Sequence, residues 1–146
     1  MTNPDYALEV EHLTKRYSIN DPIVIEDLDF QVKRGEFICL LGASGCGKST
    51  LLNILAGLDT PTQGTIRSSD KPTLMFQDAS LMPWLTAGQN VELALRIRGM
   101  AKDERRAKAQ ELLELVHLGS AYKKRPHELS GGMRQRVSIA RALAQE

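Results

Sequence analysis

The segment from Gly42 to Ser49 constrains the fold more than any other part of this sequence. It combines two fixed glycines with a Lys and a Ser, and it lies between two apolar runs, residues 37–41 and residues 51–56. The first run is short and continuous, which predicts a strand buried on both faces, and the second predicts a buried helix. A strand, a glycine loop and a helix in this order predict an α/β fold with a phosphate-binding loop.

The chemistry of the loop follows from its residue types. Glycines permit a tight turn in which backbone N–H groups converge on a phosphate, and the helix that follows adds its positive end. Lys48 is expected to reach the outer phosphates, and the Ser49 hydroxyl to ligate Mg²⁺. A chance Gly/Ser turn is the alternative, which the flanking pattern disfavours. The candidate nucleotide-binding residues here are Gly42, Ala43, Ser44, Gly45, Cys46, Gly47, Lys48, Ser49 and Thr50.

A second motif occupies residues 129–144. Ser130 is a good N-cap residue, Gly131 and Gly132 leave an open approach, and a helical apolar pattern begins there. An ordinary capped surface helix would explain this motif if it stood without the glycine loop. Paired with that loop, the segment resembles the signature of ATP-binding cassette (ABC) ATPases. The resemblance implies that Ser130, Gly131 and Gly132 face the γ-phosphate of an ATP held by a partner domain, in a head-to-tail dimer.

Two further residues match the family by position. Tyr17 lies where the family places an aromatic ring that stacks on adenine, and a strand-edge tyrosine is the alternative. Gln77 resembles the Q-loop glutamine, which contacts Mg²⁺ and the attacking water. The resemblance therefore implies ATP and Mg²⁺ as cofactors, Lys48 and Gln77 as catalytic residues, and Ser49 and Gln77 as metal contacts.

Residues 81–91 look like the corresponding stretch of the nitrate, sulfonate and taurine importer group. An exposed Met-Pro-Trp surface at Trp84 could dock a helix of a membrane subunit, whereas Trp84 in the core is the alternative. The implied partners are a second ABC ATPase domain, expected in a homodimer, a membrane permease and, indirectly, a periplasmic or extracellular solute-binding protein. The implied location is peripheral, at the cytoplasmic face of the cell membrane.

The sequence departs from the family after the signature helix. The family continues with a strand ending in Asp and Glu, a dimer-contact Asp and a switch His, whereas residue 146 precedes any of these. None of His12, His117 and His127 matches the switch position. We therefore expect a P-loop NTPase core with an antiparallel β subdomain and a helical signature subdomain, incomplete at the C-terminus. Residues 1–85 form the nucleotide-binding core, and residues 86–146 form the helical subdomain.

Several consequences are expected from that departure. A sheet lacking its next central strand exposes an apolar edge, which favours aggregation. These 146 residues are predicted to be inactive in ATP hydrolysis, because the carboxylate that polarises the attacking water in the family is not among them. Gln77 cannot replace it, since an amide accepts no proton near neutral pH.

The remaining elements follow from local patterns. Residues 8–35 predict antiparallel strands, residues 61–72 a turn-rich connection, and the run before Gln77 another strand. Residues 103–116 predict a helix with a solvated charged face, ending at Gly119 as C-cap.

Composition excludes several classes of function. A net charge of +1 gives no electrostatic case for nucleic acid, and no apolar stretch approaches the roughly 20 residues of a membrane span. The polar start is no signal peptide, and two Cys form no metal or disulfide pattern. The function predicted is an ATP-binding subunit that powers import of a small anion. The alternatives are a non-catalytic nucleotide-binding fragment and an ABC ATPase without a transport role.

Overall fold

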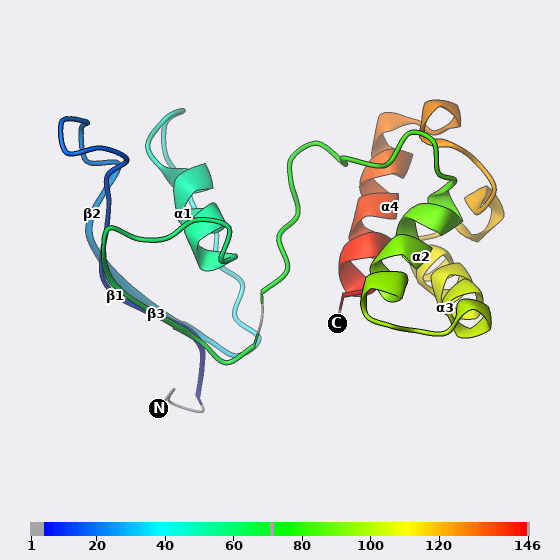
Figure 1. Cartoon of the computed structure of the whole chain (residues 1–146), viewed down its shortest axis with the longest axis horizontal. Coiled ribbons are helices and arrows are strands. Elements are labelled where there is room, and N and C mark those ends of the chain that lie inside the picture. The colour runs from blue at the N-terminus through cyan, green and yellow to red at the C-terminus, as the bar shows by residue number, and fades with distance from the viewer. Residues whose placement is uncertain (1–4, 71, 146) are drawn as a thin grey trace. The chain divides into compact units, whose positions relative to one another are not determined.

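The computed structural model describes residues 5–70 and 72–145, which fall into two compact units that divide after Leu74. Among these described residues, the first unit contains a three-stranded sheet and one α-helix, and the second is helical (Figure 1). The expected antiparallel β part and helical part are both confirmed. The glycine loop belongs to the first unit and the Ser130 segment to the second.

The sheet of the first unit has the strand order β2-β1-β3, with both pairs antiparallel. Its strands are β1 (Tyr6–Lys15), β2 (Ile25–Lys33) and β3 (Gln63–Ser68). The helix α1 (Lys48–Leu55) packs its apolar residues against the sheet, because a sheet face needs an apolar cover. The buried core of this unit consists of Val10, Leu13, Ile25, Leu51 and Ile54. The antiparallel strands expected within residues 8–35 are thus confirmed.

The turn-rich connection expected over residues 61–72 is wrong, because it contains β3. Its mostly polar residues gave no strand pattern, yet β3 pairs with β1 along its length, with Ile66 opposite Val10. Gly64 makes the close approach possible at φ +91°, since a Cβ there would lie 2.4 Å from the His12 carbonyl oxygen. Cross-strand pairing therefore outweighed local sequence preference.

The strand expected at residues 37–41 is also not observed. Within the part of the chain that the structure describes, no strand pairs with this segment, and Phe37 and Leu41 are each about 90% exposed. The run before Gln77 is likewise irregular, with Phe76 exposed. A buried parallel strand requires hydrogen-bonding neighbours. Apolar composition by itself does not supply them.

Over its described residues, 75–145, the second unit packs three α-helices around one core. These are α2 (Ala87–Ile97), α3 (Lys102–Leu115) and α4 (Gly131–Leu143), with 3₁₀ turns η1 (Gly119–Ala121) and η2 (Pro126–Glu128) between the last two. The core is rich in Ala and Leu, which allows close helix packing: Ala87, Val91, Ala94, Leu95, Ala109, Leu112, Leu113, Leu118, Ala121, Leu129, Val137, Ala140 and Ala144. No helix in the described ranges is long and apolar enough to cross a bilayer.

The helix expected over residues 103–116 is confirmed, but Gly119 is not its C-cap. The chain turns earlier, at His117, which has φ +59°. The N–H of Leu118 donates to the Leu113 carbonyl at 2.7 Å, and that of His117 donates to the Glu114 carbonyl at 2.9 Å. These two bonds form a Schellman motif, which brings Leu118 into the core. Burial of a leucine thus decided where the helix ends.

An exposed charged cluster lies on the sheet at His12. The Nδ1 atom of His12 lies 2.9 Å from Asp27 Oδ1 and 3.6 Å from Asp29 Oδ2. The hydrogen bond with Asp27, followed by the negative charges of Asp29 and Asp27, raises the pKa of His12 above its ordinary value.

This raised pKa predicts a pH-dependent interaction. The pairing contributes to folding stability below the pKa of an unfolded histidine, and the contribution is lost as pH rises through the higher folded pKa. We expect Asp27→Asn to lower the pKa of His12 toward its ordinary value, measured by NMR titration of the imidazole. Asp21→Asn, in an exposed turn, serves as the matched control and should leave it unchanged. An unchanged pKa in Asp27→Asn would contradict the assignment.

Candidate functional site

The glycine loop owes its shape to two residues with positive φ. Gly45 has φ +84° and Gly47 has φ +92°, values that L-residues rarely adopt. A Cβ at Gly47 would also lie 2.9 Å from the Val24 carbonyl oxygen. Gly47 is the N-cap of α1, so this helix begins at a residue with no side chain to cap it.

The start of α1 is consequently a set of backbone donors. The first helical hydrogen bond runs from the Leu51 N–H to the Gly47 carbonyl at 2.8 Å, so the N–H groups of residues 48–50 precede the helical ladder. The first turn of α1 contains no acidic residue. Uncapped donors and the positive end of the helix favour an anion at this position.

Lys48 is held close to the loop that precedes it. Its Nζ donates to the carbonyl oxygens of Gly42 at 2.8 Å and Ala43 at 2.7 Å, and lies 3.5 Å from Cys46 Sγ. Ser49, the next residue, is exposed. The structure thus gathers an ammonium group, a hydroxyl and a row of backbone donors within one turn of chain.

Tyr17 lies beside the same helix start. Its hydroxyl is 3.4 Å from Thr50 Oγ1, and its ring is 61% exposed. The ammonium of Lys15 lies 4.6 Å from the ring centroid, which is a cation–π contact. A flat ligand would therefore stack on the ring face away from Lys15.

The sequence patterns did not identify Lys15, which is buried and whose ammonium group contacts the Tyr17 ring. Its Nζ donates to Asp59 Oδ1 at 2.7 Å and to the Thr60 carbonyl at 2.8 Å. The hydrogen bond from Lys15 also lowers the pKa of Asp59. The available signal was the spacing of two residues between Lys15 and Tyr17, which places side chains on one face of an extended chain.

The Ser130 segment forms the start of α4 as expected. Ser130 Oγ accepts a hydrogen bond from the Met133 N–H at 3.2 Å, which confirms the N-cap. A Cβ at Gly131 or Gly132 would meet no atom within 4 Å, so this helix start is open on its outer side. Arg134 braces the preceding turn by donating to the Leu129 carbonyl at 3.2 Å. Sequence reasoning gave no role to Arg134.

Gln77 is exposed in the irregular segment that precedes α2. Two and three residues later, the carbonyl oxygens of Ala79 and Ser80 accept hydrogen bonds from the guanidinium of Arg141, at 2.9 and 2.8 Å. Arg141 lies on α4, the same helix that Ser130 caps. The Gln77 segment and the Ser130 helix are therefore joined by a charge-assisted pair of bonds.

Trp84 is 68% exposed, so its placement in the core is wrong. Met82 and Leu85 beside it are half-buried, and Pro83 is exposed. The Met-Pro-Trp stretch is thus on the surface of the second unit, as the docking hypothesis requires.

Comparisons with known proteins agree with this geometry. The family described as "ABC transporter" matches residues 25–146. The chain is 45% identical to the taurine import ATP-binding protein TauB of Mesorhizobium japonicum, over 95% of this chain and 57% of that protein. It is 45% identical to the bicarbonate transport ATP-binding protein CmpC of Synechocystis sp., over 92% of this chain and 22% of that protein. The chain thus spans about half, or less, of the length of these relatives.

Solved structures show the same likeness. A dimeric post-hydrolysis state of the ATP-binding cassette MJ0796, bound to ADP and Pi, aligns with a TM-score of 0.81 and 36% identity. That alignment covers 94% of this chain and 69% of the cassette. The cbiO1 protein from Clostridium perfringens, part of the transporter complex cbiONQ, aligns with a TM-score of 0.82 and 28% identity, covering 97% of this chain and 62% of that chain.

The two bonds of Arg141 predict a local effect of mutation. Arg141→Gln removes a cationic donor pair, and hydrogen bonds to charged groups contribute about 1.5–3 kcal/mol each. We expect amide hydrogen exchange over residues 77–82 to accelerate in this variant, by about tenfold or more.

A matched variant distinguishes this effect from general loosening of α4. Arg136 lies on the same helix and donates to the Val116 carbonyl at 3.1 Å, away from the Gln77 segment. Arg136→Gln should leave exchange over residues 77–82 unchanged. If hydrogen exchange over residues 77–82 accelerates equally in the two variants, the hydrogen bonds of Arg141 do not specifically stabilise that segment.

Proposed function

The chain belongs to the ABC transporter family, and from that membership we propose that it is part of an ATP-binding subunit that powers import of a small anion. The observation that carries the proposal is the uncapped start of α1, with Lys48 held against its loop. Within the proposal, residues 1–85 are the nucleotide-binding core and residues 86–146 the helical subdomain. The whole subunit hydrolyses ATP to drive transport.

The start of α1 fits the phosphates of ATP. Backbone donors of residues 48–50, the positive end of the helix and the Lys48 ammonium all favour an anionic group, and no acidic side chain of the first turn opposes it. Residues 42–47 of the loop would supply further backbone N–H donors to the phosphates. Tyr17, whose hydroxyl lies 3.4 Å from Thr50 Oγ1, would stack on the base.

The proposed Mg²⁺ contacts are Ser49 and Gln77, whose side chains are exposed. A hydroxyl and an amide oxygen are hard oxygen ligands, which suit Mg²⁺. A bound metal ion would neutralise charge on the phosphates, Lys48 would orient the outer phosphate groups, and Gln77 would position water. Lys48 and Gln77 are therefore the proposed catalytic residues in this part of the subunit.

The proposed partners follow from the second helix start and from the exposed Trp84 stretch. Ser130, Gly131 and Gly132 form an open helix start that suits the γ-phosphate of a nucleotide bound by a second copy, in a head-to-tail dimer. MJ0796 was solved as a dimer, which supports this assembly. A membrane permease docks at Trp84, and this places the subunit at the cytoplasmic face of the membrane. A solute-binding protein acts indirectly.

The proposed solute class rests on the relatives. TauB is a taurine import protein and CmpC a bicarbonate transport protein. We therefore propose that the solute of this chain's transporter is a small anion or a sulfonate. Bicarbonate, taurine, sulfonates and nitrate are the solutes to test, in uptake assays with the whole transporter.

Lys48→Ala tests the phosphate site. Loss of the ammonium should weaken MgATP binding by at least about 3 kcal/mol, hence more than about a hundredfold in Kd, because the phosphates lose their cationic partner. Calorimetric titration measures this loss, and circular dichroism checks that the fold is retained. Lys33→Ala, at the exposed end of β2, is the matched control. Parent-like affinity in Lys48→Ala would refute the assignment.

Tyr17 variants test the adenine contact. Tyr17→Ala should weaken ATP binding by about 0.5–1.5 kcal/mol, the contribution of an aromatic stacking pair. Tyr17→Trp and Tyr17→Phe keep an aromatic ring and should bind ATP like the parent, in the same titration. If Tyr17→Phe loses as much affinity as Tyr17→Ala, the hydroxyl contact with Thr50 is responsible, and stacking is not.

A further inference from the structure

The ammonium group of Lys15 is buried against one face of the Tyr17 ring. Lys15 is the last residue of β1, and only 7% of its surface is exposed. Its Nζ donates to Asp59 Oδ1 at 2.7 Å and to the Thr60 carbonyl at 2.8 Å, and it lies 4.6 Å from the centroid of the Tyr17 ring. A buried ammonium needs such partners, because its desolvation would otherwise be costly. The fold therefore determines where this cation lies.

The turn between α1 and β3 supplies both acceptors of Lys15, and it is tied to the end of β1 by further bonds. The Thr62 N–H donates to the Thr14 carbonyl at 2.8 Å. The Thr62 hydroxyl accepts from the Arg16 N–H and donates to the Arg16 carbonyl, each at 3.0 Å. The residues immediately before Tyr17 are thus held to the turn that follows α1.

Tyr17 is also connected to the first turn of α1. Its hydroxyl lies 3.4 Å from Thr50 Oγ1, within the helix start whose uncapped donors we propose as the phosphate site. Because α1 has eight residues, its two ends are roughly 12 Å apart. The ring is therefore positioned from both ends of the helix that begins at the phosphate site.

The contact with Lys15 leaves one face of the ring for a ligand. Tyr17 is 61% exposed, and an exposed aromatic side chain without such a contact would lose rotamer freedom when a base stacks on it. A cation held against the ring restricts its motion beforehand. The entropy lost on stacking is then smaller, because the ring is already ordered.

We propose that Lys15 is a positioning residue for the nucleobase, whose buried ammonium holds the Tyr17 ring so that one planar base stacks on its exposed face. This inference rests on the proposed function, which supplies the nucleotide. Lys15 acts through Tyr17 and touches neither the base nor the phosphates. Its contribution to affinity therefore concerns the base and leaves the phosphate contacts unchanged.

Two ligands separate the base from the phosphates. MgATP presents both, whereas magnesium tripolyphosphate presents phosphates alone, so the ratio of their affinities measures what the adenosine contributes. Calorimetric titration gives both affinities. We expect Lys15→Met, which removes the charge and keeps an unbranched side chain, to lower this ratio by about two- to tenfold, the range that corresponds to an aromatic stacking pair. Its affinity for tripolyphosphate should equal that of the parent.

A double-mutant cycle tests whether Lys15 acts through the ring. In Tyr17→Ala there is no ring to position, so adding Lys15→Met should lower the ratio no further. NMR provides a readout that needs no ligand. The ε-methylene protons of Lys15 should be shifted upfield by the ring current of Tyr17, and Tyr17→Ala should abolish that shift.

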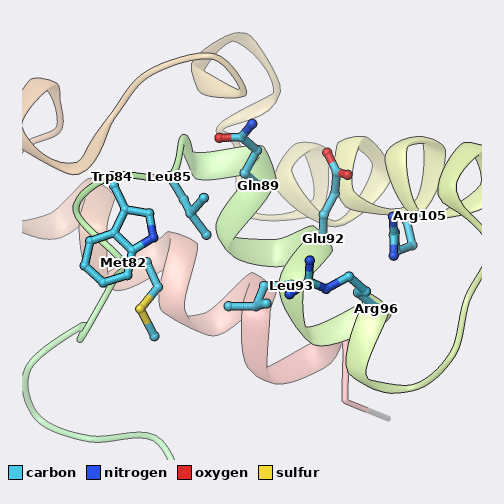
Figure 2. A pocket seen from close by; sticks show the side chains of 8 residues that line it. All are labelled: Met82, Trp84, Leu85, Gln89, Glu92, Leu93, Arg96 and Arg105. Atoms are coloured by element: carbon cyan, nitrogen blue, oxygen red, sulfur yellow. The ribbon is translucent and has the colours of Figure 1, made fainter.

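Control variants separate the cation from other effects. Asp59→Asn keeps an oxygen acceptor for Lys15 and leaves the ammonium against the ring, so its affinity ratio should match the parent's. Arg96→Gln also removes one positive charge, but from α2 in the second unit, where Figure 2 shows Arg96 among the residues that line a groove with Glu92 and Arg105. Its affinity ratio should be unchanged.

Folding is verified for each variant by circular dichroism. Lys15→Gln is a second neutral variant, whose amide can still donate to the Thr60 carbonyl, and it replaces Lys15→Met if that variant does not fold. The same decrease in the affinity ratio is expected for both.

Four results would overturn the inference. These are an unchanged ratio in Lys15→Met, equal losses of affinity for the two ligands, additive losses in the double mutant, and a loss in Asp59→Asn as large as that in Lys15→Met. Failure of the proposed function gives a different result, because the parent protein would then bind neither MgATP nor tripolyphosphate. If the parent binds both equally, the phosphate site is retained and the base contact is refuted.

Discussion

The unmet hydrogen-bonding capacity at the start of each helix is the constraint on which this structure depends. Every helix leaves its first N–H groups without an internal acceptor, and the three helices α1, α2 and α4 resolve this differently. At α2, Thr86 and Gln89 form a capping box, whereas at α4 the single hydroxyl of Ser130 caps one donor. At α1, Gly47 offers no side chain. No side chain caps α3 either, but Asp103 and Glu104 in its first turn disfavour an anion there. Capping and first-turn charge together therefore leave the starts of α1 and α4 as the two that favour an anion.

The sequence predicted those features that depend on residues close together in the chain. The glycine loop, the helix after it and the Ser130 cap were all predicted, because each depends on residues within a few positions of one another. The family and fold class followed from the pairing of the two motifs and are supported by the comparisons. The roles of Tyr17 and Gln77 toward a nucleotide stay predictions, since they rest on position within the family pattern.

Features set by distant residues could not be predicted in the same way. β3 exists because β1 offers it a partner, and its polar sequence gave no sign of this. Residues 37–41 show the converse, since an apolar run without a paired neighbour is not a strand. The support of Tyr17 by Lys15 depends on Asp59, which is more than forty positions away in the sequence. A sequence pattern thus shows which secondary structure a segment favours. It does not show which distant segment or side chain will pair with it, and that pairing decides the structure.

The tie between Arg141 and the carbonyls of Ala79 and Ser80 has a thermodynamic consequence. Because one guanidinium belongs to α4 and both acceptors belong to the segment after Gln77, a movement of either part would disturb the two bonds. Coupling of this kind is reciprocal: a ligand at the Ser130 end of α4 that favours one arrangement of the Gln77 segment is itself bound more tightly when that arrangement is already populated. Arg141 would carry such coupling in both directions, because its guanidinium makes both of these bonds.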